Sequence, residues 1–165
     1  MSSALNREEM MTALNAMLRE VSGQGVLFSH AVASRLGIGS SDLECLGYLM
    51  DGPKTAGALA EATSLTTGAI TGVVDRLEKA GFARRERDPH DRRKVLVRLE
   101  PTALERAMPY FAPMERATRS ALASYADRDL VLLLDFLAKN RDAANQAMAE
   151  LRSLADPAQD AEELE

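Results

Sequence analysis

The chain has 165 residues, of which 46% are hydrophobic and 27% charged, and its formal net charge is −5. These values are typical of one ordinary globular domain, and the absence of any apolar run near the roughly 18 residues of a membrane span excludes a membrane protein. With no Trp, 3 Tyr and 4 Phe, the core is expected to be aliphatic, which favours helices.

Cys45 is the only cysteine in the sequence. A single cysteine excludes an intramolecular disulfide and is typical of a protein in a reducing cytosol. The N-terminal stretch MSSALNREEMM lacks the basic start and apolar core of a signal peptide. We therefore expect a cytoplasmic protein without a membrane partner.

Residues 1–38 are expected to form N-terminal helices. An amphipathic helix is predicted over residues 7–21, because apolar side chains recur at spacings of four and three: Met10, Leu14, Met17 and Val21. Gly23 and Gly25 are expected to interrupt it before a second helix over residues 26–36. Gly37 suits the position just past the end of that helix.

Residues 39–100 contain the pattern of a helix-turn-helix. Ser41 and Glu44 are spaced as a capping box, which predicts a helix ending at Asp51-Gly52-Pro53. Two short helices should follow, the first capped by Thr55 and the second by Thr66 or Thr67. The second should end at Gly81 and bury one apolar face, formed by Ile70, Val73, Val74 and Leu77.

A β-hairpin is predicted directly after these helices. Residues 82–86 and 94–99 read as strands, and the charged segment 87–93 between them carries the Asp-Pro pair typical of a turn. A helix-turn-helix followed by a charged hairpin is a winged helix. The predicted fold class is therefore mainly α with a small β-hairpin wing, flanked by long dimerisation helices.

Residues 101–155 are predicted to form two long helices. The first, over 102–125, contains Pro109 and Pro113, so a bend is expected there. Asp127 should cap the second, whose apolar stripe is too long for one small domain to cover: Leu130, Leu133, Leu137, Ala144, Met148 and Leu151. We interpret this stripe as half of a homodimer interface, to which the N-terminal helix contributes. The acidic tail, residues 156–165, is expected to be disordered.

Charge is distributed unevenly along the chain. Residues 54–98 hold 10 Lys/Arg and 6 Asp/Glu, a net charge of +4, so the other 120 residues carry −9. A basic segment inside an acidic chain indicates a polyanionic partner that meets one region only.

The stretch GALAEATSLTTGAITGVVDRLEKAGFARRERDPHDRRKVLVRL resembles the multiple-antibiotic-resistance regulator (MarR) family of winged-helix transcription factors. The resemblance rests on Asp75-Arg76-Leu77-Glu78 with Gly81 in the second helix, and on the wing signature Asp88-Pro89…Asp91-Arg92-Arg93. Gly72 is a departure, because family members often carry Arg there. A second departure lies at the end of the strand after the wing. Family members usually have Leu-Thr there, followed soon by a Gly, whereas this chain has Leu99-Glu100-Pro101-Thr102.

The resemblance implies a homodimer that binds double-stranded DNA, with the recognition helix, about residues 66–79, in the major groove. The recognition-helix positions expected to contact DNA are Thr66, Thr67, Gly68, Thr71, Gly72 and Arg76. The two glycines either let the backbone approach DNA closely or pack against a neighbouring helix. Arg76 either contacts the DNA backbone or is purely structural, and Asp75 either pairs with a wing arginine or is purely structural.

The wing supplies the remaining predicted DNA contacts: Arg84, Arg85, Arg87, Arg92, Arg93 and Lys94. By resemblance, Arg93 is the wing-tip arginine for a minor groove, and Asp91 braces it through an ion pair. Asp75 is expected to pair with a wing arginine. The alternative is that the arginines form an ordinary solvated loop.

The resemblance also implies that the protein is a repressor, as most members of the family are, and that it responds to a small aromatic or phenolic effector. Phe28, His30 and Tyr48 are weak candidates for its pocket, because each residue type is more often core or surface. Cys45 is more typical of a small buried hydrophobe than of an oxidant sensor.

Two other function classes are open to test. An enzyme is disfavoured, because His30 and His90 stand near no nucleophile or metal-ligand spacing and no phosphate-binding loop follows a strand. No metal or cofactor is expected. A winged helix used only for protein contact would be expected to lose the basic wing, which this chain keeps.

Overall fold

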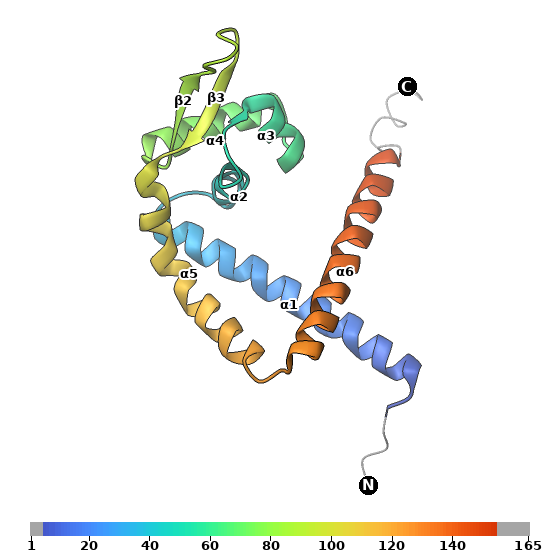
Figure 1. Ribbon diagram of the computed structural model, residues 1–165. Coiled ribbons are helices and arrows are strands. Elements are labelled where there is room, and N and C mark those ends of the chain that lie inside the picture. The colour runs from blue at the N-terminus through green and yellow to red at the C-terminus, as the bar shows by residue number, and fades with distance from the viewer. Residues whose placement is uncertain (1–4, 155–165) are drawn as a thin grey trace. The chain divides into compact units, whose positions relative to one another are not determined.

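The computed structural model describes residues 5–154, and Figure 1 shows the arrangement of helices and strands. The described chain divides into two compact units, one ending at Pro113 and one beginning at Met114. The first contains the three-stranded sheet and the short helices around it. None of the described helices is long and apolar enough to cross a membrane.

The N-terminal residues form one helix, α1 (Arg7–Leu36), so the break expected at Gly23 and Gly25 is wrong. Each glycine costs a helix only about 1 kcal/mol relative to Ala, and the rest of a 30-residue helix outweighs that cost. Asn6 and Glu9 cap its start reciprocally, and Gly37, at φ 71°, ends it in the left-handed conformation as expected.

Helix α2 (Ser40–Leu49) begins one residue before the predicted capping serine. The expected Ser41–Glu44 capping box is wrong, because Gly39 precedes the helix and its backbone N–H donates to Asp42 Oδ2 at 2.9 Å. The first backbone N–H groups of a helix have no acceptor within the helix, so an acidic side chain in the first turn stabilises them, as the Glu of a capping box does.

Two short helices follow, α3 (Ala56–Thr63) and α4 (Thr67–Lys79), with the expected hydroxyl caps. Thr55 Oγ1 accepts from the Ala58 N–H at 3.1 Å, and Thr66 Oγ1 accepts from the Ala69 N–H at 3.2 Å. The turn between them passes through Ser64 at φ 57°.

The hydrophobic core lies where α2, α3 and α4 meet the sheet. The predicted inner face of α4 is confirmed, because Ile70, Val74 and Leu77 are fully buried and Val73 nearly so. Burying such a side chain contributes about 1.5–3 kcal/mol, so this face fixes the rotation of α4 about its own axis.

The sheet contains β1 (Lys54–Thr55), β2 (Ala83–Arg87) and β3 (Val95–Leu99) in the order β1-β3-β2, all neighbours antiparallel. The predicted hairpin is confirmed, with Arg85 paired to Val97 and Arg87 to Val95. Strand β1 was not predicted, because a two-residue strand leaves no alternating pattern to detect.

Helix α5 (Pro101–Leu122) runs through Pro109 and Pro113. Helix α6 (Asp127–Ser153) has Ala126 rather than Asp127 as its N-cap, so the expected cap is wrong by one residue. Asp127 instead lies in the first turn, where a negative charge is favourable. The acidic tail expected to be disordered lies outside the described residues.

Candidate nucleic-acid interface

The outward face of α4 is formed by small residues, because its apolar residues are committed to the core. Thr66, Thr67, Gly68 and Thr71 are exposed and Gly72 is half-buried. Two hydroxyls serve the helix itself: Thr66 caps it, and Thr71 Oγ1 donates to the Thr67 carbonyl at 3.0 Å. The surface offered to a partner is therefore mainly backbone and methyl groups.

The two glycines of this face are not required by packing. A Cβ added at Gly68 would meet nothing within 4 Å, and one at Gly72 would meet only Arg76 Nη1, at 3.5 Å. The alternative that they pack against a neighbouring helix therefore receives no support. Glycine lowers the stability of α4 at these positions although packing does not require it, which points to a partner that approaches the helix backbone closely.

Arg76 is anchored by an ion pair with Asp42, a residue that sequence reasoning missed. Its Nε and Nη2 donate to Asp42, at 3.0 and 2.6 Å, and Asp42 is fully buried whereas the Arg76 side chain is 57% exposed. The hydrogen bonds to Asp42 raise the pKa of Arg76. Arg76 thus joins α4 to the start of α2, which is the structural alternative given for it above.

Arg85 is also engaged within the protein. It pairs with Asp75 at 2.8 Å and with Glu78, and its backbone N–H donates to Glu78 Oε1 at 2.6 Å. Burial would lower the pKa of Arg85, but the two carboxylates outweigh it and raise that pKa. The pairing of Asp75 with a wing arginine is as expected, and it ties β2 to α4.

Arg84 makes two further ion pairs, with Glu100 at 3.0 Å and Glu86 at 3.6 Å. Arg84 and Arg85 were expected to neutralise phosphate. In the structure both are engaged with carboxylates, which reduces the positive charge they offer to a partner.

The wing tip carries the exposed positive charge. Arg87, Arg92, Arg93 and Lys94 are all exposed, and Figure 1 shows the β2–β3 hairpin extending beyond the helices around it. No guanidinium of the three arginines has a hydrogen bond or ion pair with any residue from 5 to 154. Lys94 lies 3.7 Å from Asp91 Oδ2.

Two aspartates shape the turn at this tip. Asp88 Oδ1 accepts from the backbone N–H groups of His90 and Asp91, at 2.8 and 3.3 Å, and the bond from His90 lowers the pKa of Asp88. Asp91 Oδ1 accepts from the Arg93 backbone N–H at 3.1 Å. The expected Asp91–Arg93 side-chain ion pair is not formed, so Asp91 braces the Arg93 backbone and leaves its guanidinium exposed.

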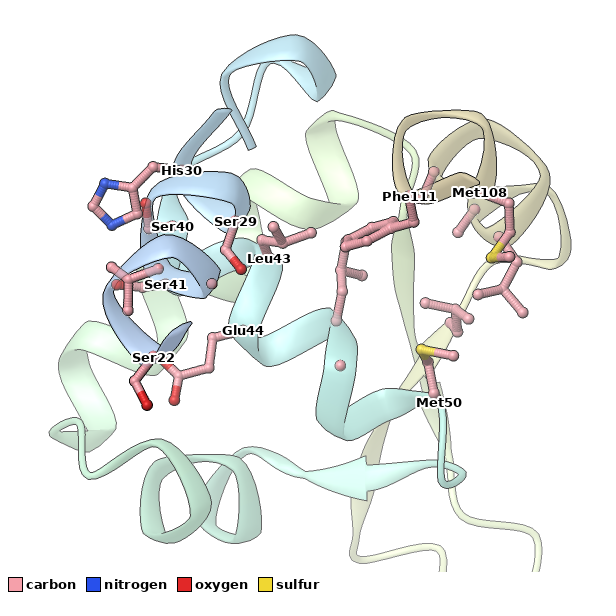
Figure 2. Close-up of a pocket in the computed structure, with 18 residues that line it drawn as sticks. Ser22, Ser29, His30, Ser40, Ser41, Leu43, Glu44, Met50, Met108 and Phe111 are labelled. Carbon is pink, nitrogen blue, oxygen red and sulfur yellow. The ribbon is translucent and has the colours of Figure 1, made fainter. Parts of the chain in front are cut away.

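Beside this domain lies a cavity of about 850 Å³, between α1, α2, the end of β3 and α5. His30 lines it, as expected, and Figure 2 shows His30 at its serine-rich side. Phe28 and Tyr48 do not line it: Phe28 contacts the lining residue Phe111 edge-on, with ring centroids 5.9 Å apart, and Tyr48 packs against the core.

Cys45 lies in the hydrophobic core and is fully buried. Burial, with smaller contributions from Asp42 and Glu44, raises the pKa of its thiol to about 11. Because the thiolate is the form that reacts with oxidants, this environment is that of a structural cysteine rather than a sensor.

Helix α5 is joined to the end of α4 by Arg106, which sequence reasoning did not single out. Arg106 Nη1 donates to the carbonyls of Ala80 and Gly81, at 2.9 and 3.1 Å. Its guanidinium carbon lies 4.0 Å from the centroid of the Phe82 ring. Arg106 therefore satisfies carbonyls that the end of α4 leaves without partners.

The comparisons with known proteins agree with this arrangement. A family model described as the MarR family matches residues 36–94. The chain is 34% identical over 153 residues to the uncharacterized HTH-type transcriptional regulator YcgE of Bacillus subtilis (strain 168), covering 92% of this chain and 99% of the relative.

Solved structures show the same fold. A MarR family protein from Bacillus stearothermophilus is 24% identical, with a TM-score of 0.68 covering 86% of this chain and 99% of that one. A mutant of S. aureus MepR bound to an oligodeoxyribonucleotide is 15% identical, with a TM-score of 0.55 covering 79% and 97% of the two chains.

Proposed function

This chain belongs to the MarR family of DNA-binding transcriptional regulators, and from this premise we propose that it is a ligand-responsive homodimeric repressor of a pseudo-palindromic operator. Like its relatives it is a regulator and not an enzyme. The observation that carries the proposal is the small-residue face of α4 beside a wing tip whose arginines are unpaired within the described chain.

Helix α4 enters the major groove with Thr66, Thr67, Gly68, Thr71 and Gly72 toward the DNA. Backbone at Gly68 and Gly72 comes close to the bases or phosphates, since no side chain intervenes. The threonine methyl groups suit contact with thymine methyls, and the Thr67 hydroxyl, which makes no hydrogen bond with a described residue, suits a phosphate. Because these side chains are short, α4 recognises each half-site with modest sequence specificity.

Arg92 and Arg93 at the wing tip reach the adjacent minor groove or its phosphates, while Arg87 and Lys94 contact the backbone. A free guanidinium is attracted to the enhanced negative potential of a narrow minor groove. Asp91 supports this role by fixing the backbone at Arg93 without occupying the guanidinium. Arg76, Arg84 and Arg85 hold the domain together instead.

Dimerisation brings two such domains to one operator. Helices α1, α5 and α6 expose apolar side chains to water, which is unfavourable. Examples are Met17, Leu122 and Leu137, which are 53%, 41% and 54% exposed. A symmetric dimer places equivalent helices in major grooves about one helical turn apart. Two half-sites then supply the affinity that one domain lacks.

Ligand response follows from how the cavity walls are connected to α4. The α2 wall is joined to α4 through Asp42 and Arg76, and the α5 wall through Arg106 and the Ala80 and Gly81 carbonyls. A ligand that separates these walls changes both attachments of the recognition helix. The spacing of the two α4 helices in the dimer changes with them, and DNA is released.

The experiment is a hydroxyl-radical footprint of the purified protein on DNA from upstream of its own coding sequence, with binding affinity measured by fluorescence anisotropy. We expect two protected regions centred about one helical turn apart, and binding much tighter than to an unrelated duplex of equal length. Equal affinity for both duplexes would contradict an operator on that DNA. An absence of binding to either at low salt would favour a protein-contact module.

A further inference from the structure

The cavity between α1, α2 and α5 has an unusual charge composition for an effector site expected to take phenolic molecules. Glu44 is the sole carboxylate among the described residues that line it, and no lysine or arginine is present there. An anionic effector would therefore meet the Glu44 carboxylate and the His30 imidazole, and no guanidinium or ammonium group.

The serines and Glu44 that line the cavity lie at one side of it, where the apolar Leu43 also lies. Figure 2 shows Ser22, Ser41 and Glu44 on one side, whereas Met50, Met108 and Phe111 lie on the other. A methionine- and phenylalanine-lined surface suits an aromatic body, because thioether and ring contacts adapt to its shape. The serine hydroxyls suit the polar end of the same molecule.

Glu44 is available for a ligand. Its side chain is exposed and makes no hydrogen bond or ion pair with any described residue. The amino end of α2, which carries partial positive charge, lies at the same side of the cavity, but Asp42 in the first turn accepts the Gly39 N–H and offsets that charge. Arg76 in turn is committed to Asp42.

We propose that this cavity binds a lipophilic cation, with an aromatic body against Met50, Met108 and Phe111 and its positive charge toward Glu44. This deepens the ligand response proposed above and rests on it. A volume of about 850 Å³ lies within the range of drug-sized ligand sites.

The test uses two probes of nearly equal shape and opposite charge, tetraphenylphosphonium and tetraphenylborate, titrated into the full chain by calorimetry. We expect tetraphenylphosphonium to bind roughly 10-fold more tightly, because Glu44 attracts one probe and repels the other across a partly solvated site. Tighter binding of tetraphenylborate, equal binding of the two, or binding of neither would overturn the proposal.

Two matched variants test whether Glu44 causes the preference for tetraphenylphosphonium over tetraphenylborate. Glu44→Gln should weaken tetraphenylphosphonium binding by about 2- to 5-fold and leave tetraphenylborate binding equal or stronger. Glu105→Gln removes an exposed carboxylate from α5 outside the cavity lining and should change neither affinity. The same loss in both variants would mean general electrostatic attraction and would overturn the role of Glu44.

Anisotropy with operator DNA in the same solutions separates the two proposals. Release of DNA by tetraphenylphosphonium from the wild type, at concentrations shifted upward by Glu44→Gln, supports both. Charge-selective binding that leaves DNA affinity unchanged would support the cation site and contradict the ligand response.

Discussion

Gly68 and Gly72 weaken α4 on the outward face that we propose to meet DNA. A Cβ at Gly68 would meet open space, and one at Gly72 would meet only Arg76 Nη1 at 3.5 Å, so an alanine would fit at either position without moving any backbone. Natural selection for stability alone would favour alanine there, because alanine is the better helix former. Their presence is explained if DNA occupies that space.

Gly68→Ala is therefore predicted to separate stability from function. We expect the free energy of unfolding in urea to rise by about 1 kcal/mol, while affinity for operator DNA falls, because the new methyl group holds the helix backbone away from the groove. Gly57→Ala, an exposed position of α3 near the Thr55 hydroxyl, is the matched control. Unchanged or tighter DNA binding by Gly68→Ala would contradict the close approach of α4.

Cys45 gives a pH dependence whose sign can be stated. Its folded pKa of about 11 lies above the 9.0 of an ordinary cysteine thiol, so the unfolded chain loses its proton first as pH rises. The Cys45 contribution to stability is thus complete below about pH 9 and declines toward pH 11, by at most about 1.4 kcal/mol per pH unit.

Urea unfolding at pH 8 and 10 measures this decline, and Cys45→Ala should be less stable at pH 8 yet lose less on going to pH 10. The two chains share every other titrating group, so the difference between their slopes belongs to Cys45. Parallel slopes would contradict a burial-raised thiol pKa.

At the residue scale, the sequence predicted which side chains are chemically suited to DNA but not which are free to bind it. Arg84 and Arg93 look equivalent in the sequence, yet Arg84 pairs with Glu86 and Glu100 whereas Arg93 has no such neighbour among the described residues. Asp42 was missed because its partner Arg76 is 34 positions away, and such a distance leaves no local spacing to detect.

At the element scale, besides the Arg85 pairs that tie it to β2, α4 is attached to the rest of its domain at three points: its buried face, the Asp42–Arg76 pair and the Arg106 contacts at its end. The first was predictable, since a 3/4 spacing of apolar residues specifies a buried face. The other two connect helices that are distant in sequence. The unbroken α1 was mispredicted because local glycine propensity was given more weight than the length of the helix.

Arg106→Ala should loosen the attachment of α4 to α5. We expect the free energy of unfolding to fall by about 1 kcal/mol, because two partly exposed hydrogen bonds and one ring contact are lost, and the DNA-releasing effect of a bound ligand to shrink. Arg106→Lys should retain part of both. Arg116→Ala, an exposed position on the same helix, serves as control; equal effects of both alanine variants would contradict a positioning role for Arg106.

At the scale of the whole molecule, the apolar surface exceeds what one chain covers. None of the described residues of α6 is buried, and Leu137, Met148 and Leu151 of its predicted apolar stripe are exposed. The sequence predicted this stripe from its spacing. It could not predict the geometry of a partner, because periodicity identifies an apolar face and not what covers it.

Leu137→Glu is predicted to convert a dimer into monomers in size-exclusion chromatography with light scattering, since a carboxylate at an apolar interface loses its hydration without a partner. Gln146→Glu adds the same charge on the opposite side of α6 and should remain dimeric. A wild type that is monomeric at micromolar concentration, or a Leu137→Glu variant that stays dimeric, would contradict the assignment of this face.

The most direct test of the account is the salt dependence of operator binding by the wild type and Arg93→Ala, with Arg116→Ala as control. If the free wing-tip guanidinium meets DNA phosphate or the minor groove, Arg93→Ala should weaken binding and reduce the slope of log affinity against log salt by about 1 per protomer. An Arg93→Ala variant that matches Arg116→Ala in affinity and slope would show that the wing does not meet DNA.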